Sequence, residues 1–262
     1  MNTIIVEGGK DMGNRIYPIG IQNFEKIRKE GYVYVDKTAL MYKLVKSGSY
    51  FFLSRPRRFG KSLLISTLEA YFEAKRDLFE GLAVETLEKD WVKRPVFHLD
   101  LNIGKYDTPD SLDKILNETL DYWESLYGTR SAETTLALRF AGVVGRAYEQ
   151  SGERVAILID EYDKPLLQAI GNEELQREFR NTLKPFYGVL KTMDGCIKFA
   201  LLTGVTKFGK VSVFSDLNNL NDISMDEPFI SICGITEKEI HLNFEEDLHE
   251  LAAAQKMTYK EV

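Results

Sequence analysis

Short, mostly apolar runs that alternate with helical patterns are the feature that most restricts how this chain can fold. A run of roughly four to eight such residues is typical of a strand whose two faces are both buried in a sheet. Five runs have this character, at residues 50–53, 96–99, 155–159, 197–202 and 229–233. We therefore expect a sheet of about five strands.

The segments between these runs carry apolar residues at the spacing of one helix face. The helical patterns cover residues 64–72, 111–127, 134–150 and 175–186, the last with a bend expected at Pro185. Strands that alternate with helices predict an α/β fold with a mainly parallel sheet flanked by helices. Ligands of such folds bind at the carboxyl ends of the strands, so the residues that follow each run are the candidates for chemistry.

The turn after the first run carries a phosphate-binding pattern. Gly60, Lys61 and Ser62 lie between a strand pattern and a helix pattern. In a P-loop, such residues supply a close turn, a cation for the β- and γ-phosphate oxygens, and a hydroxyl for Mg²⁺. We predict that this turn holds the phosphates of a nucleotide, with Ser62 as a metal ligand. The alternative is a basic turn that precedes an amphipathic helix.

The beginning of this turn departs from the usual pattern. Arg55 stands where the first glycine is expected, and Pro56 lacks one backbone N–H donor. Arg57 or Arg58 could compensate, because the planar guanidinium suits phosphate oxygens. We therefore extend the predicted nucleotide-binding residues to Arg57, Arg58 and Phe59.

A second glycine–lysine run, at residues 204–210, matches the spacing of a P-loop better. Val211 replaces the required Ser or Thr, however, so Mg²⁺ would have no hydroxyl ligand there. The residues that follow alternate as in a strand and offer no helix N-terminus to the phosphates. We prefer Lys61 over Lys210 as the phosphate ligand.

The third run ends in two carboxylates, Asp160 and Glu161. A buried acid needs a partner, and in a P-loop ATPase the first acid supports Mg²⁺ while the second polarises the attacking water. We assign Asp160 to the metal and Glu161 to catalysis. Thr203 ends the fourth run, where its hydroxyl could sense the γ-phosphate. The alternatives are acids that cap the next turn, and a β-branched residue that only completes a strand.

Composition narrows the class of protein. Forty acidic against 34 basic residues disfavour a module that coats nucleic acid, although a local contact stays open. No apolar run reaches the eighteen or so residues that a membrane helix needs, and the N-terminus has no secretion-signal pattern. Cys196 and Cys233 form no CxxC pair. These features predict a cytoplasmic protein that does not associate with a membrane.

The ends of the chain differ from its middle. Residues 1–20 are rich in glycine and are predicted to be a loose lead, and residues 21–235 form the predicted core. Thr236 begins a capping box with Glu239. A second helix start at Thr258 is followed by few residues, so we expect residues 236–262 to be the start of a helical lid that is cut short. Asp36 and Lys37 could approach the base or ribose, but we interpret them as solvated.

Four motifs together resemble the bacterial AAA-ATPase-like family of P-loop NTPases. They lie at residues 34–38, 54–62, 158–163 and 203–208, and the resemblance spans about Tyr17 to the end of the chain. The resemblance implies an AAA/STAND-type core with Walker A at Gly60–Ser62, Walker B at Asp160–Glu161 and a sensor near Thr203. It also implies that the missing first glycine is shared with the family.

Members of this family commonly continue into a PD-(D/E)XK nuclease-like domain. We expect no such domain within residues 1–262, so nuclease activity is not assigned to them, and a C-terminal nuclease-like domain stays open as a partner. Two functions remain open, with ATP and Mg²⁺ as the expected ligands. One is a hydrolase whose conformational cycle drives a partner domain, and the other is a nucleotide-gated scaffold that holds ATP or ADP with little hydrolysis. A second copy of the chain also stays open as a partner.

Overall fold

The computed structural model describes residues 15–207 and 220–259. Its centre is a five-stranded sheet with the order β2-β3-β4-β1-β5, and every paired strand runs parallel to its neighbour. The strands are β1 (Tyr50–Ser54), β2 (Val96–Asp100), β3 (Val155–Asp160), β4 (Ile197–Gly204) and β5 (Asn221–Asp222). The α/β fold predicted from the alternating runs is confirmed, and it is consistent with a P-loop NTPase-like fold.

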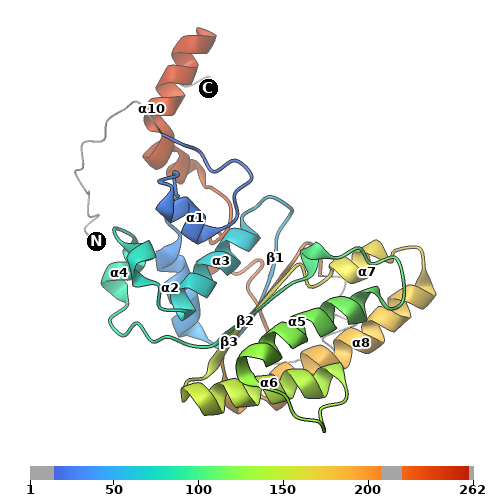
Figure 1. Ribbon diagram of the computed structural model, residues 1–262. Helices are drawn as coiled ribbons and strands as arrows, with labels where there is room; N and C mark the ends of the chain where they lie inside the picture. Colours follow the sequence, from blue (N-terminus) through green and yellow to red (C-terminus); the bar gives the residue numbers. More distant parts are fainter. Residues whose placement is uncertain (1–14, 208–219, 260–262) are drawn as a thin grey trace.

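Helices cover both faces of this sheet (Figure 1). The α-helices are α1 (Phe24–Lys29), α2 (Thr38–Ser47), α3 (Lys61–Phe72), α4 (Ala83–Leu87), α5 (Ser111–Tyr127), α6 (Leu136–Ser151), α7 (Lys164–Gln168), α8 (Glu173–Thr192) and α10 (Glu237–Gln255). Short 3₁₀ turns lie at η1 (Arg76–Phe79), η2 (Leu101–Ile103), η3 (Asp194–Cys196) and η4 (Glu227–Phe229). The four long helical patterns of the sequence correspond to α3, α5, α6 and α8.

Two apolar cores lie on opposite faces of the sheet because neighbouring residues of a strand point to opposite faces. Phe52 of β1 joins the core beneath α5, α6 and α8. Phe51 and Leu53, on either side of it, join the core beneath α1 to α4. Strand β3 is buried along its whole length, as expected for a central strand covered on both faces.

The fifth strand was predicted in the wrong place. Residues 229–233 form no strand: η4 ends at Phe229, and Ile232 and Cys233 pack into the core on the α3 face. The fifth strand is instead Asn221–Asp222, which pairs with β1. Two polar residues give no apolar run, whereas the buried loop does, so the pattern pointed to the loop.

Helix α10 begins where the capping box predicts. The Thr236 side chain accepts a bond from the Glu239 backbone, and the Glu239 side chain bonds the Thr236 backbone in return. Figure 1 shows α10 extending away from the sheet near α1. The second helix start predicted at Thr258 lies partly outside the described residues. No helix within residues 15–207 or 220–259 is long and apolar enough to span a bilayer.

Candidate functional site

The loop between β1 and α3 has the backbone of a phosphate-binding turn. Gly60 has a φ of 86° and stands directly before Lys61, the first residue of α3. No side chain caps this helix and its first turn has no acidic residue. The first N–H groups of a helix have no partner within the helix, and uncapped they form an anion site favoured by the helix dipole. The loop therefore fits the phosphates that the sequence predicts there.

Lys61 is buried at the centre of this loop, with only 4% of its surface exposed. Its Nζ donates to the backbone oxygens of Arg55 at 3.1 Å and Pro56 at 3.3 Å. The same atom lies 3.2 Å from Oε1 of Glu161. The structure thus brings together Lys61 and Glu161, the lysine and the second carboxylate that the sequence selects. Their positions in the chain differ by 100.

Asp160 and Thr203 meet across two neighbouring strands. Asp160 ends β3 and is 3% exposed, and Thr203 of β4 is fully buried. The Thr203 hydroxyl donates to Oδ1 of Asp160, and the Glu161 backbone N–H donates to the same oxygen at 3.1 Å. Glu161 has a φ of 53°, a left-handed conformation that non-glycine residues adopt at a cost. Such strain is often kept at functional sites.

A third carboxylate lies beside Asp160. Asp100 ends β2, and the strand register places it directly opposite Asp160. Burial raises the pKa of Asp100, and the negative charge of Asp160 raises it further. Ser62, the predicted metal ligand on α3, is half-buried. The carboxyl edge of the sheet is therefore acidic beside a cationic loop. Within the described residues no three His, Cys, Asp or Glu side chains are grouped to hold a metal ion by themselves, so a metal here would also need oxygen ligands from phosphate and water.

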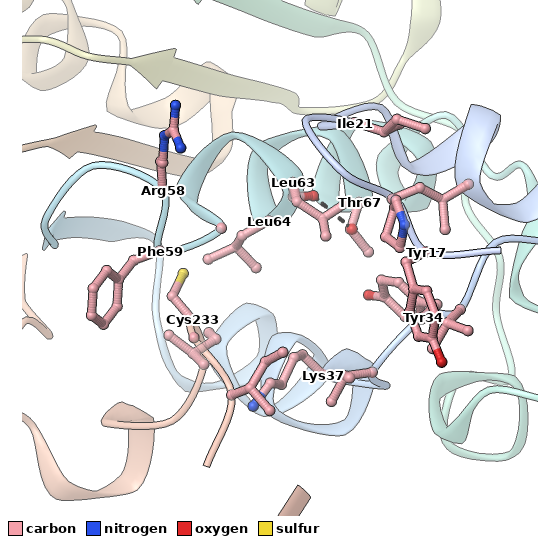
Figure 2. Close-up of a pocket in the computed structure, with 18 of the residues that line it drawn as sticks. Tyr17, Ile21, Tyr34, Lys37, Arg58, Phe59, Leu63, Leu64, Thr67 and Cys233 are labelled. Carbon is pink, nitrogen blue, oxygen red and sulfur yellow. Dashed lines mark hydrogen bonds between the residues drawn. The ribbon is translucent and has the colours of Figure 1, made fainter. Parts of the chain in front are cut away.

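The arginines of the loop take different roles. Arg55 donates to the backbone oxygens of Ser224 and Ile230, so its guanidinium holds the loop against residues 224–230. Arg57 and Arg58 are exposed, and within the described part of the chain neither has a hydrogen-bond or ion-pair partner. Figure 2 shows the Arg58 guanidinium pointing away from the cavity beside the loop. Arg57 and Arg58 thus remain available to an external anion, whereas Arg55 does not.

An apolar cavity of about 390 Å³ opens beside the phosphate loop. Its lining comes from residues 17–21, Ile27 of α1, residues 33–41, residues 58–67 of the loop and α3, residues 232–235 and Phe244 of α10. Figure 2 shows Leu63, Leu64 and Thr67 of α3 on one side and Tyr17 and Tyr34 on another. A concave, largely apolar site with few polar groups is typical of a small-molecule pocket.

The polar groups around this cavity are mostly engaged with protein partners. The Thr67 hydroxyl donates to the backbone oxygen of Leu63 at 2.7 Å. Lys37 binds Glu239 of α10 at 2.5 and 2.6 Å. Burial raises the pKa of the Cys233 thiol to about 11, so this side chain stays protonated at neutral pH. The cavity would therefore bind its occupant mainly by shape and apolar contact.

Lys37 is half-buried against α10, contrary to the interpretation from sequence, whereas Asp36 is exposed as expected but has its carboxylate hydrogen-bonded. Asp36 accepts bonds from the backbone and hydroxyl of Thr38, both at 2.7 Å, and from Ala83 N at 2.8 Å. The Asp36 carboxylate thus links Thr38, the first residue of α2, to Ala83, the first residue of α4. Lys37, bound to Glu239, joins the start of α2 to α10.

The second glycine–lysine run begins at the end of β4. Gly204 is the last residue of that strand, and Val205 and Thr206 both donate to the Asp163 carboxylate. Lys210 lies outside the described residues. Residues 205–207 form no helix, so the described part of this run lacks a helix start like the one at Lys61.

Sequence reasoning missed two parts of the site. It gave no role to Asp163, and it did not find the apolar cavity beside α3. The cavity is assembled from segments more than two hundred residues apart, each too short to carry a pattern of its own. The one signal for Asp163 was its place two residues after Glu161 in a run of acids, and position alone does not reveal what a carboxylate binds.

Comparison with known proteins places these features in a family. The family described as "AAA-ATPase_like: Predicted AAA-ATPase" matches residues 18–214. A relative from Azotobacter chroococcum mcd 1, described as "Uncharacterized protein in vnfD 5'region", is 41% identical over 239 residues. These residues are 90% of this chain and 46% of that protein. The chain thus spans about half the length of this relative.

Proposed function

This chain belongs to the AAA-ATPase-like family, and on that premise we propose that it binds ATP and hydrolyses it with Mg²⁺. Membership in the family implies a nucleotide-binding NTPase; hydrolysis and the roles of single residues are our proposal. The observation that carries it is the buried Lys61 Nζ, which lies 3.2 Å from Glu161 at the uncapped start of α3. A lysine, a helix N-terminus and a carboxylate meet there as phosphoryl transfer from ATP to water requires.

Each residue of the site has a distinct task in this proposal. The backbone N–H groups at Gly60–Ser62 and the Lys61 ammonium bind the phosphates, and Arg57 and Arg58 add charge from the open side. Ser62 and Asp160 hold Mg²⁺, which when bound neutralises charge on the phosphate oxygens. The nucleobase of ATP occupies the apolar cavity beside Leu63 and Thr67.

Glu161 is the proposed general base that polarises the attacking water. Without nucleotide its carboxylate pairs with Lys61. The phosphates of ATP compete for the same ammonium, so binding frees Glu161 to accept a proton. Thr203, hydrogen-bonded to Asp160, senses the γ-phosphate in this proposal. Substrate binding and activation of the base are therefore linked through one lysine.

The Glu161→Gln variant tests the proposal, because an amide keeps the size of the side chain but cannot act as a base. Turnover should fall by about 10²- to 10⁴-fold, the usual contribution of general-base catalysis. Mg-ATP affinity should be retained or increased, since Lys61 loses an anionic competitor. The measurements are phosphate release with and without Mg²⁺ and calorimetric binding of ATP. Asp160→Asn should instead weaken the binding that depends on Mg²⁺.

Glu88→Gln is the matched control, since Glu88 is also a buried carboxylate but lines a different cavity, with Lys46 and Trp91. It should leave turnover close to the parent value. Equal turnover in the parent and in Glu161→Gln would rule out Glu161 as the base. A parent that binds ATP but releases no phosphate would favour the second candidate, a nucleotide-gated scaffold. The Lys61–Glu161 pair would serve that candidate as well, because ATP would break it and so change the site without hydrolysis.

Coupling to a partner domain is part of the proposal and rests on α10. This helix contributes Phe244 to the cavity and Glu239 to the ion pair with Lys37. A nucleotide in the cavity would therefore contact the helix that extends from the core. We place the protein in the cytoplasm, where its two free cysteines would stay reduced.

A further inference from the structure

Asp163 is a buried carboxylate that the proposed reaction does not use. It is 1% exposed and lies two residues after Glu161. Its Oδ2 accepts bonds from Val205 N at 3.2 Å, from Thr206 N at 2.8 Å and from the Thr206 hydroxyl at 2.7 Å, and the Val205 N–H also lies within 3.3 Å of Oδ1. Within the described residues no lysine or arginine pairs with it. Burying a carboxylate without a cation is costly, so donors from one short segment must compensate it.

The neighbouring Tyr162 binds the same segment. Its backbone N–H donates to the Thr203 backbone oxygen, and its hydroxyl donates to the Thr206 backbone oxygen, both at 2.9 Å. The turn after β3 and the end of β4 approach closely at Gly204. A Cβ added there would lie 2.5 Å from the Tyr162 ring and 2.7 Å from Asp163 Oδ1. Only glycine fits there without displacing the turn that follows β3.

The phosphate loop, between β1 and α3, contacts residues 203–206 from the other side. The Arg55 backbone N–H donates to the Gly204 oxygen at 3.1 Å, and the Ser54 hydroxyl donates to the Val205 oxygen at 3.1 Å. Residues 203–206 therefore lie between the phosphate loop and the turn that bears Glu161. The position of this segment decides how far the Thr203 hydroxyl stands from both.

We propose that Asp163 is a positioning residue that fixes residues 203–206, and with them the Thr203 hydroxyl, between the phosphate loop and Glu161. The inference rests on the proposed ATP hydrolysis and deepens it. Asp163 touches neither the phosphates nor the water in this arrangement. It acts through the three donors of Val205 and Thr206, so it should affect the rate of the chemical step more than the affinity for ATP.

The Asp163→Asn variant is the first test, because the amide has no negative charge, and its NH2 group replaces one of the two carboxylate oxygens that the Val205 N–H faces. We expect kcat to fall by about 10- to 100-fold, the effect of a misplaced group in a site of this kind. The Kd for ATP should stay within about threefold of the parent value. Glu88→Gln serves as the control, since it also replaces a buried carboxylate that accepts several hydrogen bonds.

Thr206 variants keep the inference testable if Asp163→Asn does not fold. Thr206→Val removes the hydroxyl and should lower kcat in the same direction by a smaller factor. Thr206→Ser keeps the hydroxyl and should restore the parent rate. In the Asp163→Asn/Thr206→Val double variant the losses should not add, because both changes remove the same bond.

The outcomes separate this inference from the proposed function. If the parent hydrolyses ATP and neither Asp163→Asn nor Thr206→Val lowers kcat more than Glu88→Gln does, Asp163 has no positioning role. Equal losses in kcat and in ATP affinity would also overturn it, since they would mark a general loss of structure. A parent that releases no phosphate removes the proposed hydrolysis and this inference together.

Discussion

The phosphate end and the base cavity of the proposed nucleotide site are built in different ways. At the phosphate end, polar groups stand on the ends of neighbouring parallel strands, and the register of the sheet fixes their separation. At the cavity, the walls come from the N-terminal segment, α3, residues 232–235 and α10. One end is positioned by the core of the fold and the other by contacts between peripheral segments.

This difference in construction indicates which part of the site can change position without disturbing the sheet. Moving Asp160 would require a change in the central sheet, where it ends β3 and is buried. Moving the wall formed by α10 would require breaking a few surface contacts, among them the ion pair between Arg15 and Asp247 at 2.7 Å. We expect changes at the phosphate end to act on ATP specifically. Changes at the cavity should act equally on ATP and on adenosine, which has no phosphate.

The largest loss of ATP affinity is expected for Lys61→Ala. The substitution removes the buried cation that would bind phosphate and leaves Glu161, its partner at 3.2 Å, unpaired. The ATP phosphates would lose this charge-assisted bond and would meet the uncompensated Glu161 carboxylate instead, so ATP binding should be lost in a calorimetric titration. Adenosine affinity should stay near the parent value. Lys210→Ala is the matched control and should bind ATP normally; the reverse order would place the phosphates at the second glycine–lysine run.

A smaller effect is expected when Arg57 and Arg58 are both replaced by Ala. Both side chains are exposed, so their attraction to phosphate is weakened by water and screened by salt. ATP affinity should fall by roughly tenfold at low salt, the loss should shrink as salt rises, and adenosine affinity should not change. If ATP binds the double variant as it binds the parent, these arginines serve a contact outside this nucleotide site.

The phosphate end could be predicted from sequence because its signals are local. Gly60, Lys61 and Ser62 stand together between a strand and a helix, and Asp160 and Glu161 follow a run of buried aliphatic residues. A parallel sheet brings such strand ends to one edge whatever the separation along the chain. The α/β fold followed from the same alternation of patterns.

The cavity could not be predicted because its contacts are not local. Lys37 looked solvated, since nothing near it in sequence is its partner; Glu239 lies 202 residues away. Residues 229–233 looked like a strand, since an apolar run records burial but not what covers it. Asp163 was given no role for the same reason, since its donors belong to a segment after β4.

The smallest loss of nucleotide affinity is expected for Glu239→Gln. This variant is also the most direct test of whether the phosphate end and the base cavity act independently. Both oxygens of Glu239 accept bonds from Lys37 Nζ, at 2.5 and 2.6 Å, and Oε2 also accepts a bond from Thr236 N. The bond to Lys37 keeps the pKa of Glu239 low despite partial burial. Gln can still cap the helix but loses the charge, which should cost about 1 kcal/mol for a partly exposed pair. Affinity for ATP and for adenosine should therefore fall by the same factor, about two- to fivefold, in parallel titrations. Glu237→Gln, an exposed change two residues earlier on α10, should leave both unchanged. If Glu239→Gln weakened ATP alone, α10 would act on the phosphates, and the division of the site into two independent ends would be wrong.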